Sequence, residues 1–186
     1  AGFDGDVLIL YGDVPFVPAA TMQAMIDRLG AADAPAVVVL AFEPADPLQY
    51  GRVITDGDRV VKMVEHKDAT DAERAVRLCN SGLMAAKARD LFALLARVTD
   101  NNAAKEFYLV DIVNIANADG RSCAVVKTDA DDVAGINSRA ELAVAEAQWQ
   151  AFKRDEAMAG GASLRAPDTV WFSWDTELGR DVTIEP

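Results

Sequence analysis

Cysteine and histidine are scarce in this sequence. Its 186 residues include two cysteines, Cys79 and Cys123, and one histidine, His66. The cysteines lie far apart in apolar runs, outside any Cys-x-x-Cys pair, so we expect two buried free thiols and a cytoplasmic protein. No serine or cysteine nucleophile signature accompanies His66, and its charged neighbours favour a solvated turn over a catalytic role.

Glycine-rich phosphate loops and long apolar runs are also missing. The sequence contains neither G-x-G-x-x-G nor G-x-x-x-x-G-K-[ST]. Enzymes that handle nucleotides normally use such a loop, so this part of a nucleotide site is absent from the chain. There is no signal-peptide pattern and no apolar run long enough to span a bilayer, so we expect no membrane partner.

Basic residues are few relative to acidic ones. The sequence has 18 Lys and Arg against 30 Asp and Glu, which gives a net charge of -12. This balance argues against a nucleic-acid partner, for which a basic stripe is expected. It does not exclude a phosphorylated substrate, because bound magnesium or a few well-placed bases can offset local charge. The length suits one domain with a good core and a short additional piece.

The apolar pattern predicts an α/β fold. A continuous apolar run, Val7–Leu10, indicates a strand buried on both faces, and Ala36–Phe42 indicates a second one. Between them, Ala19–Leu29 has apolar residues at helical spacing, with Gly30 as its stop. Strand, helix and strand in this order form a βαβ unit, which implies a parallel sheet with both faces covered.

A hairpin and further alternating elements follow. Alternating stretches at Arg52–Thr55 and Arg59–Glu65 flank an Asp-Gly-Asp turn, which is a good hairpin signal. The remaining expected elements are a loop with a short helix (Lys67–Arg77), a strand with a polar insert (Leu78–Ala85), two helices (Ala88–Val98 and Phe107–Ala118) and a strand (Ser122–Thr128).

The end of the chain has a different character. Ser138 and Glu141 form a capping-box pattern that opens a long helix running to about Met158. In the tail beyond Gly160–Gly161, the apolar residues Leu178 and Ile184 are six positions apart, the spacing of a hexapeptide-repeat β-helix. A β-helix needs about three or more rungs to bury a core, so we interpret the tail as the start of a second domain.

Several polar residues follow the predicted strands and have two interpretations each. Asp13 comes just after the first strand, where α/β sheets bind ligands, and could hold magnesium or cap a turn before Pro15; the residues alone favour the turn. Asn80-Ser81-Gly82 indicates a bulge or a place where a ligand is recognised. Asn137 could be a second metal ligand or part of a turn.

Taken together, these motifs resemble one family, the bifunctional bacterial N-acetylglucosamine-1-phosphate uridylyltransferase / glucosamine-1-phosphate N-acetyltransferases. The matching stretches are LILYGDVPF, YGRVI, VEHKDATD, CNSGLMA, TDNNAAKEFYLVDIV, GINSRAEL and LGRDVTIEP, in the family's order. The resemblance covers essentially the whole chain. VEHKDATD and the Asn-Asn-x-x-x-Glu-x-Tyr stretch are its most specific parts.

The resemblance implies a Rossmann-like nucleotidyltransferase fold of the GT-A-like kind, lacking its N-terminal strands. Residues 1–137 would form the C-terminal part of the uridylyltransferase domain and 138–161 a linking helix. Residues 162–186 would form the first turn of a left-handed parallel β-helix, the acetyltransferase domain. The implied reaction joins UTP and N-acetylglucosamine 1-phosphate into UDP-N-acetylglucosamine and pyrophosphate. Positioning and metal-ion charge stabilisation dominate such a transfer.

The resemblance also implies roles for individual residues. Mg²⁺ would be held by Asp13 and Asn137, with no catalytic side chain beyond these ligands. The substrate-binding residues would be Tyr11, Gly12 and Asp13 on the nucleotide-sugar site, Gly51, Glu65 and Asn80 around the N-acetylglucosamine part, and Asn137. The full-length family members would use acetyl-CoA in the second reaction and form homotrimers.

Two departures from the family pattern stand out. Lys105 occupies a position where the family usually has glycine, so its loop is expected to differ. The family's glycine-rich nucleotide loop is missing from this sequence, so we expect the chain alone to have little or no activity. A metal-dependent glycosyltransferase is an alternative, but Asp13-Val14-Pro15 lacks the expected D-x-D pair. A non-catalytic binding module is the other alternative, which the missing loop favours.

Overall fold

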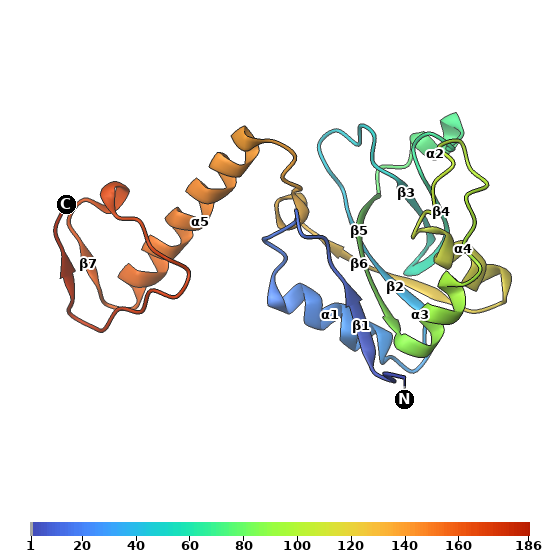
Figure 1. The fold of residues 1–186 in the computed structure, drawn as a ribbon, viewed down its shortest axis with the longest axis horizontal. Coiled ribbons are helices and arrows are strands. Elements are labelled where there is room, and N and C mark those ends of the chain that lie inside the picture. Colours follow the sequence, from blue (N-terminus) through green and yellow to red (C-terminus); the bar gives the residue numbers. More distant parts are fainter. Residues whose placement is uncertain (1) are drawn as a thin grey trace. The chain divides into compact units, whose positions relative to one another are not determined.

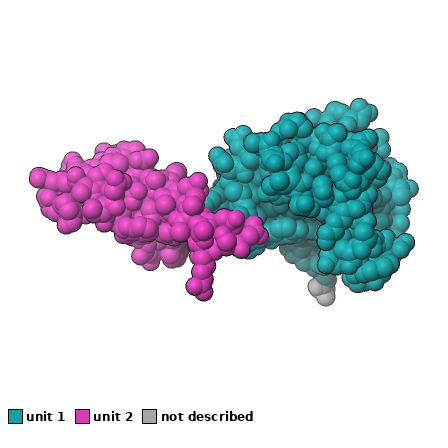
Figure 2. Space-filling model, turned by 90° about the horizontal axis from the view of Figure 1, so that it is seen from above, with its two compact units in different colours: residues 1–135 teal, residues 136–186 magenta. Residues whose placement is uncertain are grey.

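The computed structural model describes residues 2–186, which form two compact units. The first unit extends to Gly135 and the second comprises Ile136–Pro186, and Figure 2 colours them separately. Each unit is described by itself below. The domain boundaries expected after residues 137 and 161 stay predictions.

The first unit combines strands and helices around one sheet (Figure 1). Its strands are β1 (Asp6–Ile9), β2 (Val37–Phe42), β3 (Arg52–Asp56), β4 (Arg59–Val64), β5 (Cys79–Lys87) and β6 (Cys123–Thr128). Its helices are α1 (Ala19–Leu29), α2 (Asp71–Arg74), α3 (Ala88–Leu95) and α4 (Asp111–Ala118), followed by the 3-10 turn η1 (Ala130–Val133). The expected hairpin and the expected helix ending at Gly30 are confirmed, whereas α4 begins four residues later than expected.

The sheet is mixed rather than wholly parallel, and this corrects the expectation from the βαβ pattern. Its strand order is β1-β5-β2-β6-β4-β3. Strand β5 lies between β1 and β2 and is antiparallel to both, whereas β2 and β6 are parallel. A strand from later in the chain therefore separates the two strands of the βαβ unit. The fold class itself, an α/β Rossmann-like domain, is confirmed.

Strand β1 is less buried than its apolar sequence suggests. It stands at one end of the sheet that residues 2–186 form, and its residues Val7, Leu8 and Ile9 are half-buried. Val7 and Ile9 pack against one core cluster, whereas Leu8 packs against the other. The prediction of a strand buried on both faces is therefore wrong in degree, although both faces do contact core residues.

Strand β2 divides the core into two layers. All six of its residues are buried, and alternate side chains point to opposite faces. Val37, Val39 and Ala41 join a cluster with residues of α3 and α4, whereas Val38 and Leu40 join a cluster with Met25 and Leu29 of α1. Cys79 lies in the second cluster and Cys123 in the first, and both are buried free thiols as expected.

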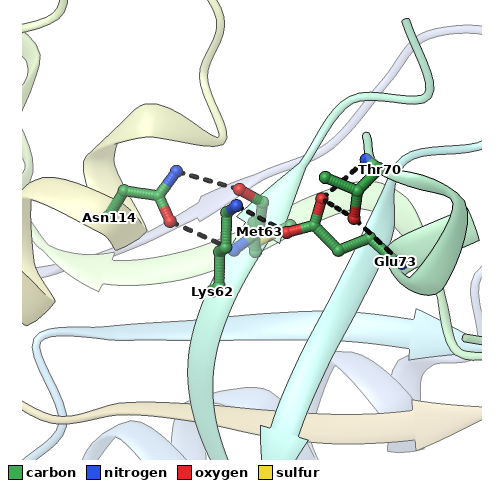
Figure 3. A network of polar contacts seen from close by, with 5 residues as sticks. All are labelled: Lys62, Met63, Thr70, Glu73 and Asn114. Carbon is green, nitrogen blue, oxygen red and sulfur yellow. Dashed lines mark hydrogen bonds and ion pairs between the residues drawn. The ribbon is translucent and has the colours of Figure 1, made fainter. Parts of the chain in front are cut away.

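The β3–β4 hairpin is held by side chains from two helices (Figure 3). Asn114 of α4 accepts from the Met63 N–H (3.1 Å) and donates to the Met63 carbonyl (2.9 Å), so one amide satisfies both backbone groups of that residue. On α2, Glu73 pairs with Lys62 at 2.5 Å and completes a capping box with Thr70. The bond from Lys62 lowers the pKa of Glu73 to about 2, and bonds from Thr70 add to this effect.

The second unit consists of a helix and a short parallel pair of strands. Helix α5 (Arg139–Ala159) begins at Ser138, whose hydroxyl accepts from the Glu141 N–H (3.2 Å). Glu141 completes the cap on the N–H of Asn137 (2.6 Å) rather than on that of Ser138. After η2 (Pro167–Thr169), β8 (Thr183–Ile184) pairs in parallel with β7 (Ser163–Leu164). The start of a β-helix stays a prediction.

The loop before α4 has a residue in the left-handed region. Lys105 has φ +58 and is exposed, and its N–H donates to the Asn102 carbonyl (3.3 Å). The Asn102 side chain closes the loop by accepting from the Glu106 N–H (3.2 Å). This conformation favours glycine, which is the residue usual at this position in the family that the sequence resembles. No helix among residues 2–186 is both long and apolar enough to cross a membrane.

We expect Lys105→Gly to stabilise the chain. The left-handed conformation costs a side chain roughly 1–2 kcal/mol, and the greater freedom of glycine in the unfolded state cancels part of the gain. The free energy of unfolding should therefore rise by about 0.5–1 kcal/mol in urea titrations. Lys67→Gly, in an exposed turn without positive φ, is the matched control and should lower it. A lower free energy of unfolding in Lys105→Gly would contradict the view that the left-handed conformation of Lys105 is strained.

Candidate functional site

The ends of four strands meet at one edge of the first unit. Because β1 and β5 are antiparallel, β1 runs toward the amino end of β5, and its last residue, Ile9, pairs with Met84. At the same end, Arg52 of β3 pairs both with Val64 of β4 and with Cys79 of β5. The segments that follow β1 and β4 and precede β3 and β5 are therefore gathered, and they carry most of the predicted site residues.

Tyr11 lies against the polar insert of β5. A Cβ atom built on Gly82 would stand 2.2 Å from Cε2 of the Tyr11 ring, and Gly82 has φ +87. Only glycine therefore satisfies both the backbone conformation and the approach of the ring. Burial raises the pKa of the Tyr11 hydroxyl, and the negative charges of Glu65 and Asp13 raise it further. Tyr11, Asp13, Glu65 and Gly82 thus share one small region.

The polar insert of β5 is a bulge, as one of its two interpretations predicted. Between the pairs Val39–Met84 and Ala41–Asn80, β5 has extra residues, and the Ser81 hydroxyl donates to the Leu40 carbonyl (2.7 Å). The side-chain oxygen of Asn80 accepts from the Gly82 N–H (2.9 Å). The bulge is therefore satisfied internally, and the Asn80 amide nitrogen donates to no acceptor within residues 2–186.

Gly51 and Glu65 are in direct contact beside Asn80. A Cβ atom on Gly51 would stand 3.2 Å from Oε2 of Glu65, and the Gly51 carbonyl accepts from the Asn80 N–H (2.9 Å). The three residues that were expected to bind the sugar part therefore adjoin one another. This geometry uses backbone pairing between β3 and β5, which no local sequence pattern indicates.

Three further residues, Asp68, Asp111 and Tyr108, gather around Glu65, and no pattern in the sequence singled them out as site residues. Burial raises the pKa of Glu65, and the carboxylates of Asp68 and Asp111 raise it further. The pKa of Asp111 and that of the Tyr108 hydroxyl are also raised, in each case mainly by burial. Asp68 accepts from the Ala103 N–H (3.0 Å), which links the two most specific motifs. The position of these residues within the stretches VEHKDATD and TDNNAAKEFYLVDIV was the one signal in the sequence that could have pointed to them.

Asp13 and Gly12 lie in an exposed turn after β1. The turn is closed by a bond from the Val14 N–H to the Tyr11 carbonyl (3.3 Å), and no residue among 2–186 donates to the Asp13 carboxylate. An exposed carboxylate without a protein partner suits Mg²⁺, which prefers oxygen ligands and retains several waters. No group of three or more His, Cys, Asp or Glu within residues 2–186 is placed to hold a metal alone.

For two other candidates, Asn137 and His66, the structure shows no part in this region. Asn137 belongs to the second unit, and its pairing with Asp13 stays a prediction. The Nδ1 atom of His66 is buried without a hydrogen-bond partner, and the His66 carbonyl accepts from Arg74 (3.3 Å). The expectation of a solvated turn residue is thus only partly correct, because His66 lies in a turn but is half-buried.

Replacing Gly82 tests the contact with Tyr11. Gly82→Ala should lower the free energy of unfolding by about 2–4 kcal/mol, because positive φ and a clash with the ring both oppose the methyl group. Gly57→Ala is the control, since Gly57 also has positive φ (+58) but has no atom within 4 Å of the added Cβ, and it should cost about 1–2 kcal/mol.

The double variant Tyr11→Ala/Gly82→Ala removes the clash and keeps the positive φ. In urea titrations, Gly82→Ala should therefore cost less in the Tyr11→Ala background than in the wild type. Equal costs in the two backgrounds would contradict the packing of Tyr11 on Gly82.

The carboxyl group of Glu65 should titrate above its usual pH range. Its folded-state pKa exceeds the unfolded value of 4.5, so the folded state binds more protons between these values and the free energy of unfolding falls as the pH rises through this window. Carbon-detected NMR titration measures this pKa. Asp68→Asn should lower it, whereas Asp71→Asn, which removes a fully exposed acid, should leave it unchanged. A Glu65 pKa at or below 4.5 would contradict the geometry.

The chain matches known proteins over its whole length. It is 91% identical over 186 residues to "Bifunctional protein GlmU" of Sphingopyxis alaskensis and covers 41% of that protein. It is 72% identical to the protein of the same name from Novosphingobium aromaticivorans, of which it covers 42%, and 61% identical to that of Rhizorhabdus wittichii, of which it covers 41%. No family model matches the chain.

Solved structures with the same fold include a thymidylyltransferase and a synthetase. A putative glucose-1-phosphate thymidylyltransferase from Bacillus anthracis has a TM-score of 0.56 at 14% identity, over 78% of this chain and 55% of that one. A CMP:2-keto-3-deoxy-manno-octonic acid synthetase complexed with CTP has a TM-score of 0.56 at 18% identity, over 77% and 61%. These identities establish the fold alone. By sequence, the chain belongs to the bifunctional GlmU family, and it spans about two fifths of the length of the curated relatives that it matches.

Proposed function

We propose that the chain supplies the sugar-binding half of a sugar-phosphate nucleotidyltransferase. The substrates are UTP and N-acetylglucosamine 1-phosphate, and the products are UDP-N-acetylglucosamine and pyrophosphate. The observation that carries the proposal is the contact of Gly51, Glu65 and Asn80 beside Tyr11, in a chain 91% identical to a bifunctional GlmU protein.

The chemistry of these groups suits a neutral sugar rather than a phosphate. The Glu65 carboxylate accepts hydrogen bonds from sugar hydroxyls, and the free amide nitrogen of Asn80 donates to a sugar or N-acetyl oxygen. Gly51 has no side chain, so the sugar can approach the backbone closely beside Glu65. Tyr11 and Gly12 line the nucleotide-sugar site next to them.

The transfer itself requires little covalent work from side chains. An oxygen of the sugar phosphate attacks the α-phosphorus of UTP, a P–O bond forms, and the bond to the pyrophosphate group breaks. The residues of this chain bind and orient the sugar phosphate for that attack. Asp13, together with Asn137, would hold Mg²⁺, which neutralises phosphate charge when it is bound. Both offer the oxygen donors that this ion prefers.

The finer assignments of the family are part of the same proposal. Residues 1–137 would belong to the uridylyltransferase domain, 138–161 to the linking helix and 162–186 to the start of the β-helix. The full-length protein would be a cytoplasmic homotrimer that also uses acetyl-CoA. The parallel pairing of β7 with β8 supports a β-helix, because adjacent rungs of such a helix pair in parallel.

A segment exchange tests the proposed function. The corresponding segment of the Sphingopyxis alaskensis protein is replaced by this chain, and pyrophosphate release is measured with UTP, N-acetylglucosamine 1-phosphate and Mg²⁺. We expect turnover within about 3-fold of the unaltered protein, because 91% of the residues are identical. An inactive exchange protein that is nevertheless folded would contradict the proposal.

Within this exchange protein, Asp13→Asn tests the metal assignment. The substitution keeps the size of the side chain and removes its charge, so turnover should fall by about 100-fold or more. The Mg²⁺ concentration for half-maximal rate should rise. Asp56→Asn, at an exposed acid of the hairpin, is the matched control and should change neither quantity. Normal turnover and metal dependence in Asp13→Asn would remove Asp13 as a ligand.

A further inference from the structure

Arg52 is a buried arginine whose bonds all go to backbone carbonyls. Its exposed fraction is 3%, and its Nε donates to the Arg74 carbonyl (3.3 Å). Its two terminal nitrogens donate to the carbonyls of Pro47 (3.5 Å), Leu48 (3.4 Å) and Tyr50. No carboxylate within residues 2–186 forms an ion pair with it. The guanidinium therefore organises the main chain of the loop 47–50.

This arrangement fixes the direction of the Gly51 N–H. The Tyr50 carbonyl and the Gly51 N–H belong to one planar trans peptide, so they point in opposite directions. Because Arg52 binds the Tyr50 carbonyl, the Gly51 N–H points away from the guanidinium. That N–H donates to no acceptor within the described part of the chain, although Gly51 is buried. A buried donor without a partner is costly unless a ligand or water satisfies it.

The Gly51 peptide also lies where the sugar is proposed to bind. A Cβ atom built on Gly51 would stand 3.2 Å from Oε2 of Glu65, and the Gly51 carbonyl accepts from the Asn80 N–H. Movement of the loop 47–50 would therefore displace Gly51 relative to both residues. Leu48 in this loop has φ +38, a conformation that side chains rarely adopt and that the bond to Arg52 helps to hold.

Arginine is suited to this role in a way that lysine is not. The guanidinium has five donors in a fixed plane, and four of them are used here on carbonyls of two separate segments. A lysine ammonium has three donors at one point and cannot reach both the loop and the end of α2. Arginine, but not lysine, can therefore hold the loop 47–50 against the rest of the unit.

We propose that Arg52 is a positioning residue for the sugar end of the site: by gathering the loop carbonyls, it presents the unpaired Gly51 N–H to an oxygen of the bound sugar. The sugar-binding part of this statement rests on the proposed function. The effect of Arg52 on the loop 47–50 does not depend on the proposed function, because it concerns the chain without ligand.

The experiment compares Arg52→Lys and Arg52→Met with the unaltered chain. Arg77→Met is the matched control, because Arg77 donates to the Pro44 (2.6 Å) and Ala45 carbonyls at the beginning of the same connection but not to residues 47–50. Two quantities are measured where thermal unfolding confirms that every variant is folded. The first is hydrogen exchange of the Tyr50 and Asn80 amides, and the second is the NMR-detected Kd for N-acetylglucosamine 1-phosphate.

Both Arg52 variants should lose protection of the Tyr50 and Asn80 amides by about 10-fold or more, while amides of β2 stay protected. Their Kd should rise by about 5-fold or more, since the hydrogen bond from the Gly51 N–H to the sugar would be lost. Arg52→Lys retains the positive charge and should lose protection and affinity as Arg52→Met does. This result would show that the planar arrangement of the guanidinium donors matters, and not the charge alone. Arg77→Met should change neither quantity.

Unchanged protection of both amides in Arg52→Lys and Arg52→Met would overturn the proposal, whatever the Kd. Lost protection with an unchanged Kd would overturn the sugar-positioning role. If the unaltered chain does not bind N-acetylglucosamine 1-phosphate, the sugar-binding part of the proposed function fails. The exchange data then decide by themselves whether Arg52 holds the loop.

Discussion

Strand β5 is the element on which the rest of the first unit depends. It pairs with β1 on one side and β2 on the other, and its first residue also pairs with β3. Its central residues Leu83–Ala86 are buried, so their apolar surface fixes the register of both neighbours. The bulge at its amino end then has a fixed place, and that place brings Gly82 to Tyr11 and Asn80 to Gly51. The arrangement of the candidate site therefore depends on the position of β5.

Charge divides the candidate site into two parts under the proposed function. The like charges of Glu65, Asp68 and Asp111 repel an incoming phosphate; burial chiefly raises the pKa of Glu65, and the other two carboxylates add to it. Carboxylates are good acceptors for hydroxyl groups, so this part suits the neutral ring of a sugar. The phosphates must then lie on the side of Asp13, where a cation can offset the charges. A chain with a net charge of -12 can therefore bind a phosphorylated substrate only with help from a cation or from bases outside this cluster.

Local elements were predictable from the sequence, whereas their pairing was not. The end of α1 at Gly30 and the hairpin around Gly57 follow from helical spacing and turn chemistry, which act over a few residues. The insertion of β5 between β1 and β2 joins segments far apart in sequence, and no local pattern encodes it. Motif resemblance pointed to Gly51, Glu65 and Asn80, but Asp111 comes near Glu65 only because α4 packs beside β4.

Helix α4 couples the stability of the hairpin to the properties of the candidate site. Asn114 binds both backbone groups of Met63, two residues before Glu65, and therefore holds the end of β4 against the helix. Asp111 is three residues earlier on the same helix and so lies on the same face, where its charge raises the pKa of Glu65. The bond that orders β4 thus also brings a like charge toward Glu65. Any change that loosens α4 should weaken the hairpin and lower the pKa of Glu65 together, because one contact surface carries both effects.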